Sequence, residues 1–242
     1  MLDILYLDDY LAIVHKPAGW LVHRTPLDKG ETRFVLQTLR DQIGRHVWPV
    51  HRLDKGTSGV LVFALSAEVA RMLGQAFETG EALQKTYRAI VRGWPSDQGL
   101  IDHSLKRMPD DMRSEREEVQ PAQTRYVTLR RGELPIAQGE FPSLRWAEVQ
   151  LHPLTGRRHQ LRRHMKHIAH PIIGDATHGK GPLNRAVAAH IGVARLWLHA
   201  LQLVMRHPVT GQALTVDAPC SEEWSFWPDQ TQTPGVVMSQ SG

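Results

Sequence analysis

Cysteine is almost absent from this sequence. Among 242 residues there is one, Cys220, so no disulfide can form within the chain, which suits a reducing compartment. The first residues carry no basic segment ahead of an apolar run, which argues against a secretory signal. No stretch approaches the roughly 20 consecutive apolar residues that cross a bilayer. We therefore expect a cytoplasmic protein that does not associate with membranes.

Known cofactor motifs are absent as well. The sequence has neither a Walker-type phosphate loop nor the glycine-rich fingerprint of dinucleotide-binding folds. A group of four histidines raises the question of zinc: His159, His164, His167 and His170. Their spacing is not that of a common structural zinc site, and no cysteine lies near them. We expect neither a metal nor a small-molecule cofactor, and a metal-dependent hydrolase is a distant alternative.

Positive charge is modest overall but concentrated in one place. The formal net charge is +4, and residues 157–166 read Arg-Arg-His-Gln-Leu-Arg-Arg-His-Met-Lys. A solvated amphipathic helix is the ordinary explanation for such a run. Two features favour an anionic partner instead. Thr155-Gly156 precedes the run, so amides at a helix start would be available to an anion. Arg162 follows Leu161, close to the buried edge, where a guanidinium needs a partner.

Short alternating segments dominate the chain and predict its fold class. Helical periodicity is found at 33–43, between Ser66 and Gly80, and after position 156. Strand patterns are more numerous, at 4–6, 11–14, 60–65, 85–93, 124–129, 146–151, 196–204 and 213–216. Many strands in an apparent meander with few helices indicate an α+β fold with a largely antiparallel sheet.

The length is that of one domain. We expect residues 1–227 to form it, with a polar surface excursion at 103–120. The segment 228–242 is rich in Gln, Ser, Thr and Gly, and we expect it to be a flexible tail.

The most informative motif is His51-Arg52-Leu53-Asp54, followed by Thr57-Ser58-Gly59 and an apolar run. Most loop aspartates cap turns or pair with a neighbouring arginine. A carboxylate on a tight loop before a buried strand is also a candidate nucleophile or base. To stay charged while partly desolvated it needs a cationic partner, for which the sequence offers Arg157, Arg158 and Arg162. No second carboxylate has a convincing setting for paired acid/base work, which weakens a glycosidase interpretation.

Tyr87 is the second candidate, inside a predicted strand between Lys85 and Arg88. A half-buried sheet tyrosine is the ordinary explanation. Its basic neighbours also allow it to stack on a nucleobase, because aromatic rings beside cations suit nucleic-acid contacts.

Six segments, taken together and in order, resemble the RluA-type pseudouridine synthases. They are Lys16-Pro17-Ala18-Gly19; His51-Arg52-Leu53-Asp54 with Thr57-Ser58-Gly59; Lys85-Thr86-Tyr87 with Val91-Arg92-Gly93; Thr155-Gly156-Arg157-Arg158-His159-Gln160-Leu161-Arg162; His170-Pro171-Ile172-Ile173-Gly174-Asp175; and Leu198-His199-Ala200. Each is modestly specific, whereas the ordered set is very specific and spans almost the whole chain. The resemblance implies an α+β fold with a central, mostly antiparallel sheet flanked by helices, and an RNA-binding cleft.

The resemblance also implies a reaction and a site. A uridine within RNA would be isomerised to pseudouridine without cofactor or metal. Asp54 matches the family's catalytic aspartate, Tyr87 the tyrosine that packs on the target base, and Arg162 the arginine that pairs with the aspartate. Arg52 matches the arginine associated with flipping the nucleotide out of its stack. The other RNA contacts are expected at His51, Arg157, Arg158 and His159.

The resemblance narrows the RNA partner. Residues 19–24 and 40–44 resemble the branch of the family that modifies tRNA at position 65. Many relatives carry an N-terminal S4 RNA-binding domain, for which Lys16-Pro17 lies too near the start, so we expect the catalytic domain of a monomer to grip the RNA itself. The alternatives are a pseudouridine synthase acting on ribosomal RNA and a non-catalytic RNA-binding protein of the same fold.

Overall fold

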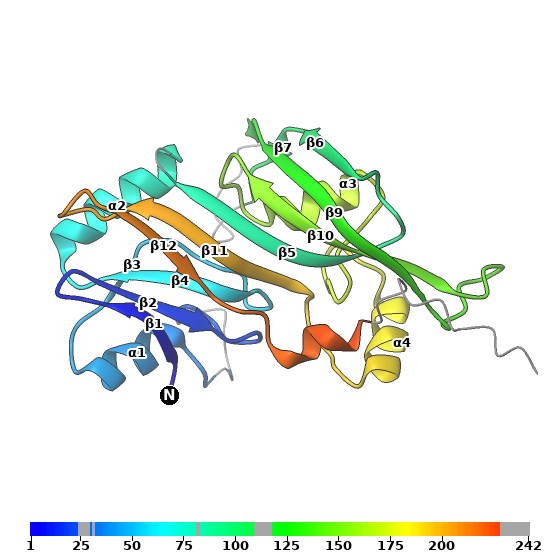
Figure 1. The fold of residues 1–242 in the computed structure, drawn as a ribbon, viewed down its shortest axis with the longest axis horizontal. Coiled ribbons are helices and arrows are strands. Elements are labelled where there is room, and N and C mark those ends of the chain that lie inside the picture. Colours follow the sequence, from blue (N-terminus) through cyan, green and yellow to red (C-terminus); the bar gives the residue numbers. More distant parts are fainter. Residues whose placement is uncertain (24–29, 31, 81–82, 109–117, 228–242) are drawn as a thin grey trace, which may run out of the picture.

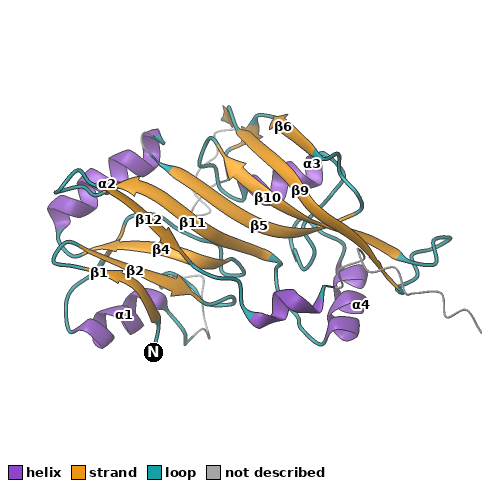
Figure 2. Cartoon of the chain, viewed as in Figure 1, coloured by secondary structure: helices purple, strands orange, loops and turns teal. Residues whose placement is uncertain are grey.

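The computed structural model of the chain describes residues 1–23, 30, 32–80, 83–108 and 118–227. A ten-stranded sheet runs through these parts, in the order β1-β2-β4-β11-β5-β10-β9-β6, with β12 beside β11 and β3 beside β4 (Figure 1; Figure 2). Its strands are β1 (Asp3–Leu7), β2 (Leu11–Lys16), β3 (Trp48–Pro49), β4 (Ser58–Ala64), β5 (Gln84–Arg92), β6 (Gln98–Asp102), β9 (Gln123–Leu134), β10 (Leu144–Pro153), β11 (Leu198–Arg206) and β12 (Ala213–Asp217). A small hairpin of β7 (Leu105–Lys106) and β8 (Val119–Gln120) stands apart from it.

The pairing pattern confirms the predicted fold class. Among the described strands, the pairings in this sheet are antiparallel except that of β4 with β11. The helices are α1 (Val35–Ile43), α2 (Ala67–Thr79), α3 (Gln160–His167), α4 (Gly181–Ile191) and the short 3₁₀ helix η1 (Glu222–Phe226). Each predicted strand segment overlaps a strand of the structure, although 60–65 and 85–93 run one residue too far and 196–204 starts two residues too early. The helices predicted at 33–43 and between Ser66 and Gly80 are present.

Local chemistry sets the bounds of α2 as the sequence predicted. The Ser66 hydroxyl accepts a hydrogen bond from the backbone N–H of Val69, which caps the first turn. Gly80 ends the helix in the left-handed region, at φ 72°, where glycine carries no side-chain penalty.

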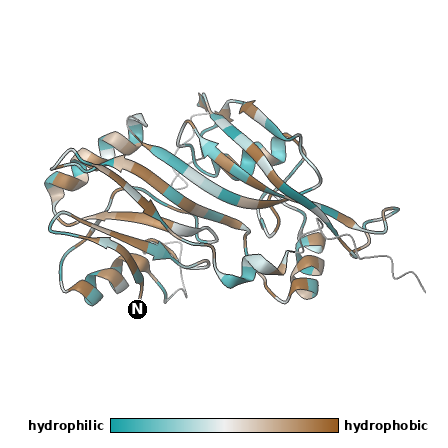
Figure 3. Ribbon diagram, viewed as in Figure 1, coloured by the Kyte–Doolittle hydropathy of each residue, from teal (hydrophilic) through white to brown (hydrophobic). Residues whose placement is uncertain are grey.

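The sheet is covered on both faces, and its strands β4 and β11 are rich in hydrophobic residues (Figure 3). On one face α1 packs on β2 and β4, and α3 packs on β5 and β10. On the other face lie α2, and a cluster of tryptophans between α4 and η1. Tyr87 packs against the clusters under both α1 and α3, which places it between them on the first face. The candidate site forms on this face.

One predicted helix start is wrong. The basic helix begins at Gln160, not at Thr155-Gly156. The Gln160 side chain explains the delay, because its Oε1 accepts hydrogen bonds from the Thr155 hydroxyl and the Arg157 backbone N–H. His159 then adopts φ 54°, a left-handed conformation that no helix interior tolerates. Arg157 and Arg158 therefore lie on a turn, and the anion-binding helix start predicted beside them is not formed there.

Several elements were not predicted, among them the short strands β3, β7 and β8 and the 3₁₀ helix η1. Neither β6 nor α4 was expected from the periodicity. Two predictions fall wholly or partly outside the described residues. The surface excursion predicted at 103–120 is flanked by β7 and β8, but its centre, 109–117, is not among the described residues, and nor is the tail predicted at 228–242.

Candidate active site

Asp54 lies on the loop that joins β3 to β4. The loop closes in a tight turn, in which the Thr57 backbone N–H donates to the Asp54 carbonyl at 3.0 Å. β4 then passes so close to β11 that a Cβ on Gly59 would lie 2.1 Å from the Ala200 carbonyl oxygen. Only glycine fits there, which explains the Thr-Ser-Gly segment after the aspartate. The Asp54 side chain retains 27% exposure.

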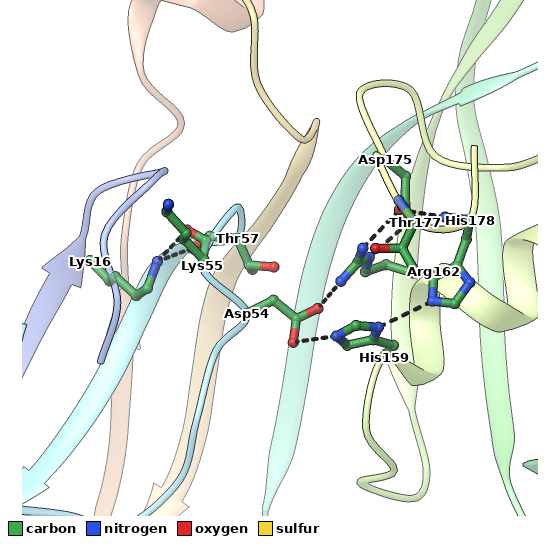
Figure 4. A network of polar contacts seen from close by, with 9 residues as sticks. All are labelled: Lys16, Asp54, Lys55, Thr57, His159, Arg162, Asp175, Thr177 and His178. Atoms are coloured by element: carbon green, nitrogen blue, oxygen red, sulfur yellow. Dashed lines mark hydrogen bonds and ion pairs between the residues drawn. The ribbon is translucent and has the colours of Figure 1, made fainter. Parts of the chain in front are cut away.

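Arg162, from α3, reaches Asp54 across the sheet face (Figure 4). Its Nη1 donates to Asp54 Oδ2 at 2.8 Å, while its Nε and Nη2 donate to the two oxygens of Asp175 at 2.8 and 2.7 Å. Burial alone would lower the pKa of Arg162, but the hydrogen bonds to Asp175 and Asp54 raise it. One buried guanidinium thus holds two carboxylates, and the predicted pairing of Asp54 with Arg162 is seen in the geometry.

Asp175 was part of the matching sequence but had no assigned role. Its side chain is fully buried. Burial would raise its pKa, but the hydrogen bonds from Arg162 and from the backbone N–H of His178 outweigh this and lower it. Asp175 Oδ1 accepts the N–H groups of Thr177 and His178 at 2.9 and 2.8 Å. The carboxylate therefore fixes both the guanidinium and the following turn.

Two histidines complete the polar network around Asp54. The Nε2 of His159 lies 3.7 Å from Asp54 Oδ1, and its Nδ1 lies 3.1 Å from the Nε2 of His178. The two oxygens of Asp54 thus have different neighbours, a guanidinium at Oδ2 and an imidazole at Oδ1 (Figure 4). The predicted part of His159 was an RNA contact, and nothing in the sequence pointed to His178.

Lys16 supports the loop of Asp54 through hydrogen bonds to its backbone carbonyls. It is fully buried at the end of β2. Its ammonium donates to the carbonyls of Thr57, Lys55 and Pro17 at 2.6, 3.0 and 3.1 Å, and thereby ties two loops together. Burial lowers the pKa of Lys16 to about 7, against the opposing effect of the Asp54 carboxylate. The Lys-Pro motif is a support of the loop that carries Asp54.

This buried lysine gives a pH prediction. The pKa of Lys16 is about 7 in the folded protein, against an ordinary value of 10.5, so between those pH values the unfolded chain binds the extra proton. Stability conferred by this site therefore rises with pH in that window, by up to about 1.4 kcal/mol per pH unit. Denaturant unfolding at pH 7.5 and pH 9 should show that Lys16→Met removes this rise relative to the unmodified protein. Equal pH dependence in the two proteins would contradict the assignment.

Ser58, directly after the loop, is held by a second buried set of contacts. Its hydroxyl accepts from Arg195 Nη2 at 2.6 Å and lies 2.8 Å from the Nδ1 of His199. The Nε2 of His199 lies 2.7 Å from the Ala218 carbonyl, which can only accept, so Nδ1 is free to accept from Ser58. Burial lowers the pKa of His199 to about 4 and keeps it neutral. These contacts fix the start of β4.

Tyr87 lies on β5, opposite Ala200 of β11 and Leu151 of β10. Burial raises the pKa of its phenol, and the Asp54 carboxylate raises it further. Tyr87 therefore stays a neutral phenol near Asp54. Its side chain packs against the hydrophobic clusters beneath both α1 and α3.

The remaining predicted RNA-contact residues fall into two groups. Arg52 and Arg158 have exposed side chains next to the site. Arg157 is partly buried and its Nε donates to the Pro121 carbonyl. Their RNA contacts stay predictions.

His51 is different from these residues. Its ring stacks on Phe77 at 4.3 Å, and its Nε2 accepts the backbone N–H of Val62. Burial lowers the pKa of His51 to about 3, and Lys85 lowers it further. These contacts give the ring a structural part and do not favour the predicted RNA contact.

The four histidines considered for zinc have separate partners. His164 bonds Thr124 and the His103 carbonyl, His170 bonds the Arg92 carbonyl, and the ring of His167 stacks on His103. Within the described ranges, no group of three or more His, Cys, Asp or Glu is arranged to hold a metal ion. In the same ranges no helix is long and apolar enough to cross a membrane.

Comparisons with known proteins point to one family. Residues 10–167 match the family model described as RNA pseudouridylate synthase. The chain is 52% identical over 241 residues to tRNA pseudouridine synthase C of Yersinia pestis. The matched residues cover 98% of this chain and 93% of that protein. It is 51% identical over 228 residues to tRNA pseudouridine synthase C of Vibrio cholerae, with 93% of each covered.

Solved structures agree with the sequence comparison. Human RNA pseudouridylate synthase domain containing 1 is similar with a TM-score of 0.69 and 26% identity, over 91% of this chain and 84% of that one. Human RNA pseudouridylate synthase domain containing 4 gives a TM-score of 0.67 and 26% identity, over 93% of this chain and 90% of that one.

Proposed function

The chain belongs to the RNA pseudouridylate synthase family, as its resemblance to the RluA-type enzymes predicted, and we propose that it isomerises a uridine of tRNA to pseudouridine with Asp54 as the reacting group. The observation that carries the assignment of the site is the Asp54–Arg162–Asp175 network, in which a partly exposed carboxylate is held by a buried guanidinium. A protein that only binds RNA has no use for a carboxylate held toward a phosphate-rich ligand, because the two repel each other.

The reaction exchanges two bonds at the same sugar carbon. The bond from C1′ of the ribose to N1 of uracil breaks, and a bond from C1′ to C5 forms. A proton leaves C5 and one is gained at N1, so no oxidant or reductant is required. The freed uracil must turn without escaping, which requires a closed pocket and a group that reacts with either the sugar or the ring.

Asp54, Arg162 and Tyr87 have different parts in the proposed reaction. Asp54 presents its carboxylate, and Arg162 supports the charge through a hydrogen bond to Oδ2. Oδ1 is then the oxygen available to react, whether at the ribose carbon, at the ring or at a sugar proton. Tyr87 supplies a neutral aromatic surface near the carboxylate, on which the flipped base would pack.

The substrate proposal rests on two supports. The relatives from Yersinia pestis and Vibrio cholerae, at 52% and 51% identity, are named as tRNA enzymes. Residues 19–24 and 40–44 of the sequence resemble the branch that acts at position 65, which we propose as the target. The runner-up is ribosomal RNA.

Tritium release tests the reaction and the substrate together. Uridine labelled with tritium at C5 loses the label when C5 bonds to the sugar. We expect release from a tRNA transcript and none above background from a ribosomal RNA transcript. Replacing position 65 of the tRNA with cytidine should abolish it. Release from ribosomal RNA alone would move the assignment to the alternative substrate, and release from neither would contradict the proposed function.

Arg52 gives a prediction about base flipping. The guanidinium lies on the loop of Asp54, two residues away, with an exposed side chain. Extracting a stacked uridine costs a few kcal/mol, and an arginine that occupies the vacated place would offset part of that cost. Arg52→Ala should therefore lower kcat/KM on folded tRNA by about 10²-fold but affect a short flexible oligonucleotide much less. Arg52→Lys is the matched control for charge, and equal losses on both RNAs would count against flipping.

We propose in addition that residues 1–227 act as one domain and as a monomer in the cytoplasm. The single cysteine, Cys220, suits a reducing compartment such as the cytoplasm.

A further inference from the structure

The contacts around Asp54 form a closed ring. Asp54 bonds Arg162, Arg162 bonds Asp175, and Asp175 accepts the backbone N–H of His178. The side chain of His178 meets His159, whose Nε2 returns to Asp54. Arg162 accounts for one arm of this ring and for one oxygen of Asp54. The second arm, in which His178 contacts His159 and His159 contacts Asp54, does not involve Arg162 and has no part in the Asp54–Arg162 pairing.

The backbone conformation of His159 is unusual for a residue other than glycine. It is one of two non-glycine residues with positive φ within the described chain, at φ 54°. Non-glycine residues adopt such a conformation infrequently, and it is found where function or packing demands it. The conformation sets the ring between Asp54 and His178, with 15% of the side chain exposed.

The tautomer of His159 follows from its neighbours. A carboxylate only accepts hydrogen bonds, so an attractive contact with Asp54 needs a proton on Nε2. A neutral His159 then has an unprotonated Nδ1, which must accept, and His178 Nε2 at 3.1 Å must donate to it. The opposite arrangement would direct a lone pair of His159 at the carboxylate.

Burial and the nearby cations favour the neutral form of both histidines. Burial lowers the pKa of His159, and burial also lowers that of His178. Asp54 opposes the first shift and Asp175 the second. The cations that reinforce the shifts are Arg158 and Arg162 for His159, and Arg162, Lys166 and Arg163 for His178.

We propose that His159 is a positioning residue for Asp54. In this arrangement His178 fixes His159 in the neutral tautomer whose Nε2–H faces Oδ1 of Asp54. Arg162 and His159 then hold the carboxylate from two sides, so that Oδ1 keeps one orientation toward the substrate. At 3.7 Å the imidazole orients Oδ1 without covering it. The inference rests on the proposed function, because it gives His159 a part in the same reaction.

The proposal has a distinctive consequence for His178. A donor at Nδ1 favours the neutral form of His159, so its removal raises the pKa of His159. The imidazolium would form an ion pair with Asp54 and reduce its reactivity. His178→Leu should therefore move the acid limb of the kcat profile to higher pH, by about half a unit or more. His178→Gln offers an amide N–H to the same nitrogen and should leave the limb in place.

The test combines a measurement on the protein alone with kinetics. Imidazole nitrogen shifts from NMR report the tautomer of His159 without RNA. We expect the Nε2–H form in the unmodified protein and in His178→Gln, and greater protonation of His159 at a given pH in His178→Leu. His159→Gln should lower kcat by about tenfold with little change in KM. His190→Gln, at an exposed position on α4, is the matched control.

Two results would overturn the proposal. One is a His159 protonated on Nδ1 in the unmodified protein, which requires no variant to fold. The other is a His178→Leu protein with unchanged His159 shifts and an unchanged acid limb. If the tautomer is as inferred but no tRNA releases tritium, the proposed function fails while the ring geometry stands, so the two failures are distinguishable.

Discussion

Replacing Arg162 with methionine is expected to abolish turnover and to destabilise the fold. The guanidinium is buried, with 8% of its side chain exposed, and Asp175 beside it is completely buried. Removing one partner of a buried ion pair leaves an uncompensated charge and typically costs about 3–5 kcal/mol. Asp54 would also lose the hydrogen bond to Oδ2. Denaturant unfolding and tritium release from tRNA measure the two effects.

A second substitution separates stability from chemistry. Asp175→Asn in the Arg162→Met background removes the stranded charge, while the asparagine carbonyl can still accept the N–H groups of Thr177 and His178. Much of the lost stability should return, because replacing both partners of a buried pair is often close to neutral. Turnover should stay lost, because Asp54 still lacks its guanidinium. A double variant that regains turnover would show that Arg162 matters only for folding.

Asp54→Asn should have a large effect on the reaction and little effect on folding or RNA binding. Asparagine has the same shape and can still accept from Arg162, so folding should be retained. Without a carboxylate there is no nucleophile or base, and we expect turnover to fall by roughly 10³-fold or more. Affinity for tRNA should be preserved or slightly raised, because a negative charge facing the RNA has been removed. Fluorescence anisotropy for binding and tritium release for turnover separate the two.

Much of the site was predictable because its residues lie in short motifs. Asp54, Tyr87 and Arg162 were named as candidates from the sequence, and the structure brings Arg162 within 2.8 Å of Asp54. Asp175 and Lys16 lie within the matching segments, but the sequence did not reveal which groups they contact. A carboxylate shared by one guanidinium, or an ammonium bonded to three carbonyls, appears only when the fold joins distant segments.

The fold was predictable where periodicity is strong. The strand patterns and the caps of α2 at Ser66 and Gly80 gave correct elements, because local chemistry decides them. α4 was missed because it opens on Gly181-Pro182 and buries a single residue, Val187. The start of α3 was misplaced because side-chain bonds of Gln160 hold the preceding turn, and a periodicity argument does not include such bonds.

The central claim is that Asp54 performs the chemistry on a uridine of tRNA. The most direct test is single-turnover tritium release from C5-labelled tRNA, with enzyme in excess over RNA so that weak binding cannot limit the result. The account predicts that the unmodified protein releases the label of one uridine per tRNA, and that Asp54→Asn releases it roughly 10³-fold more slowly or not at all. Stoichiometric release by Asp54→Asn at a rate within about tenfold of the unmodified protein would contradict it.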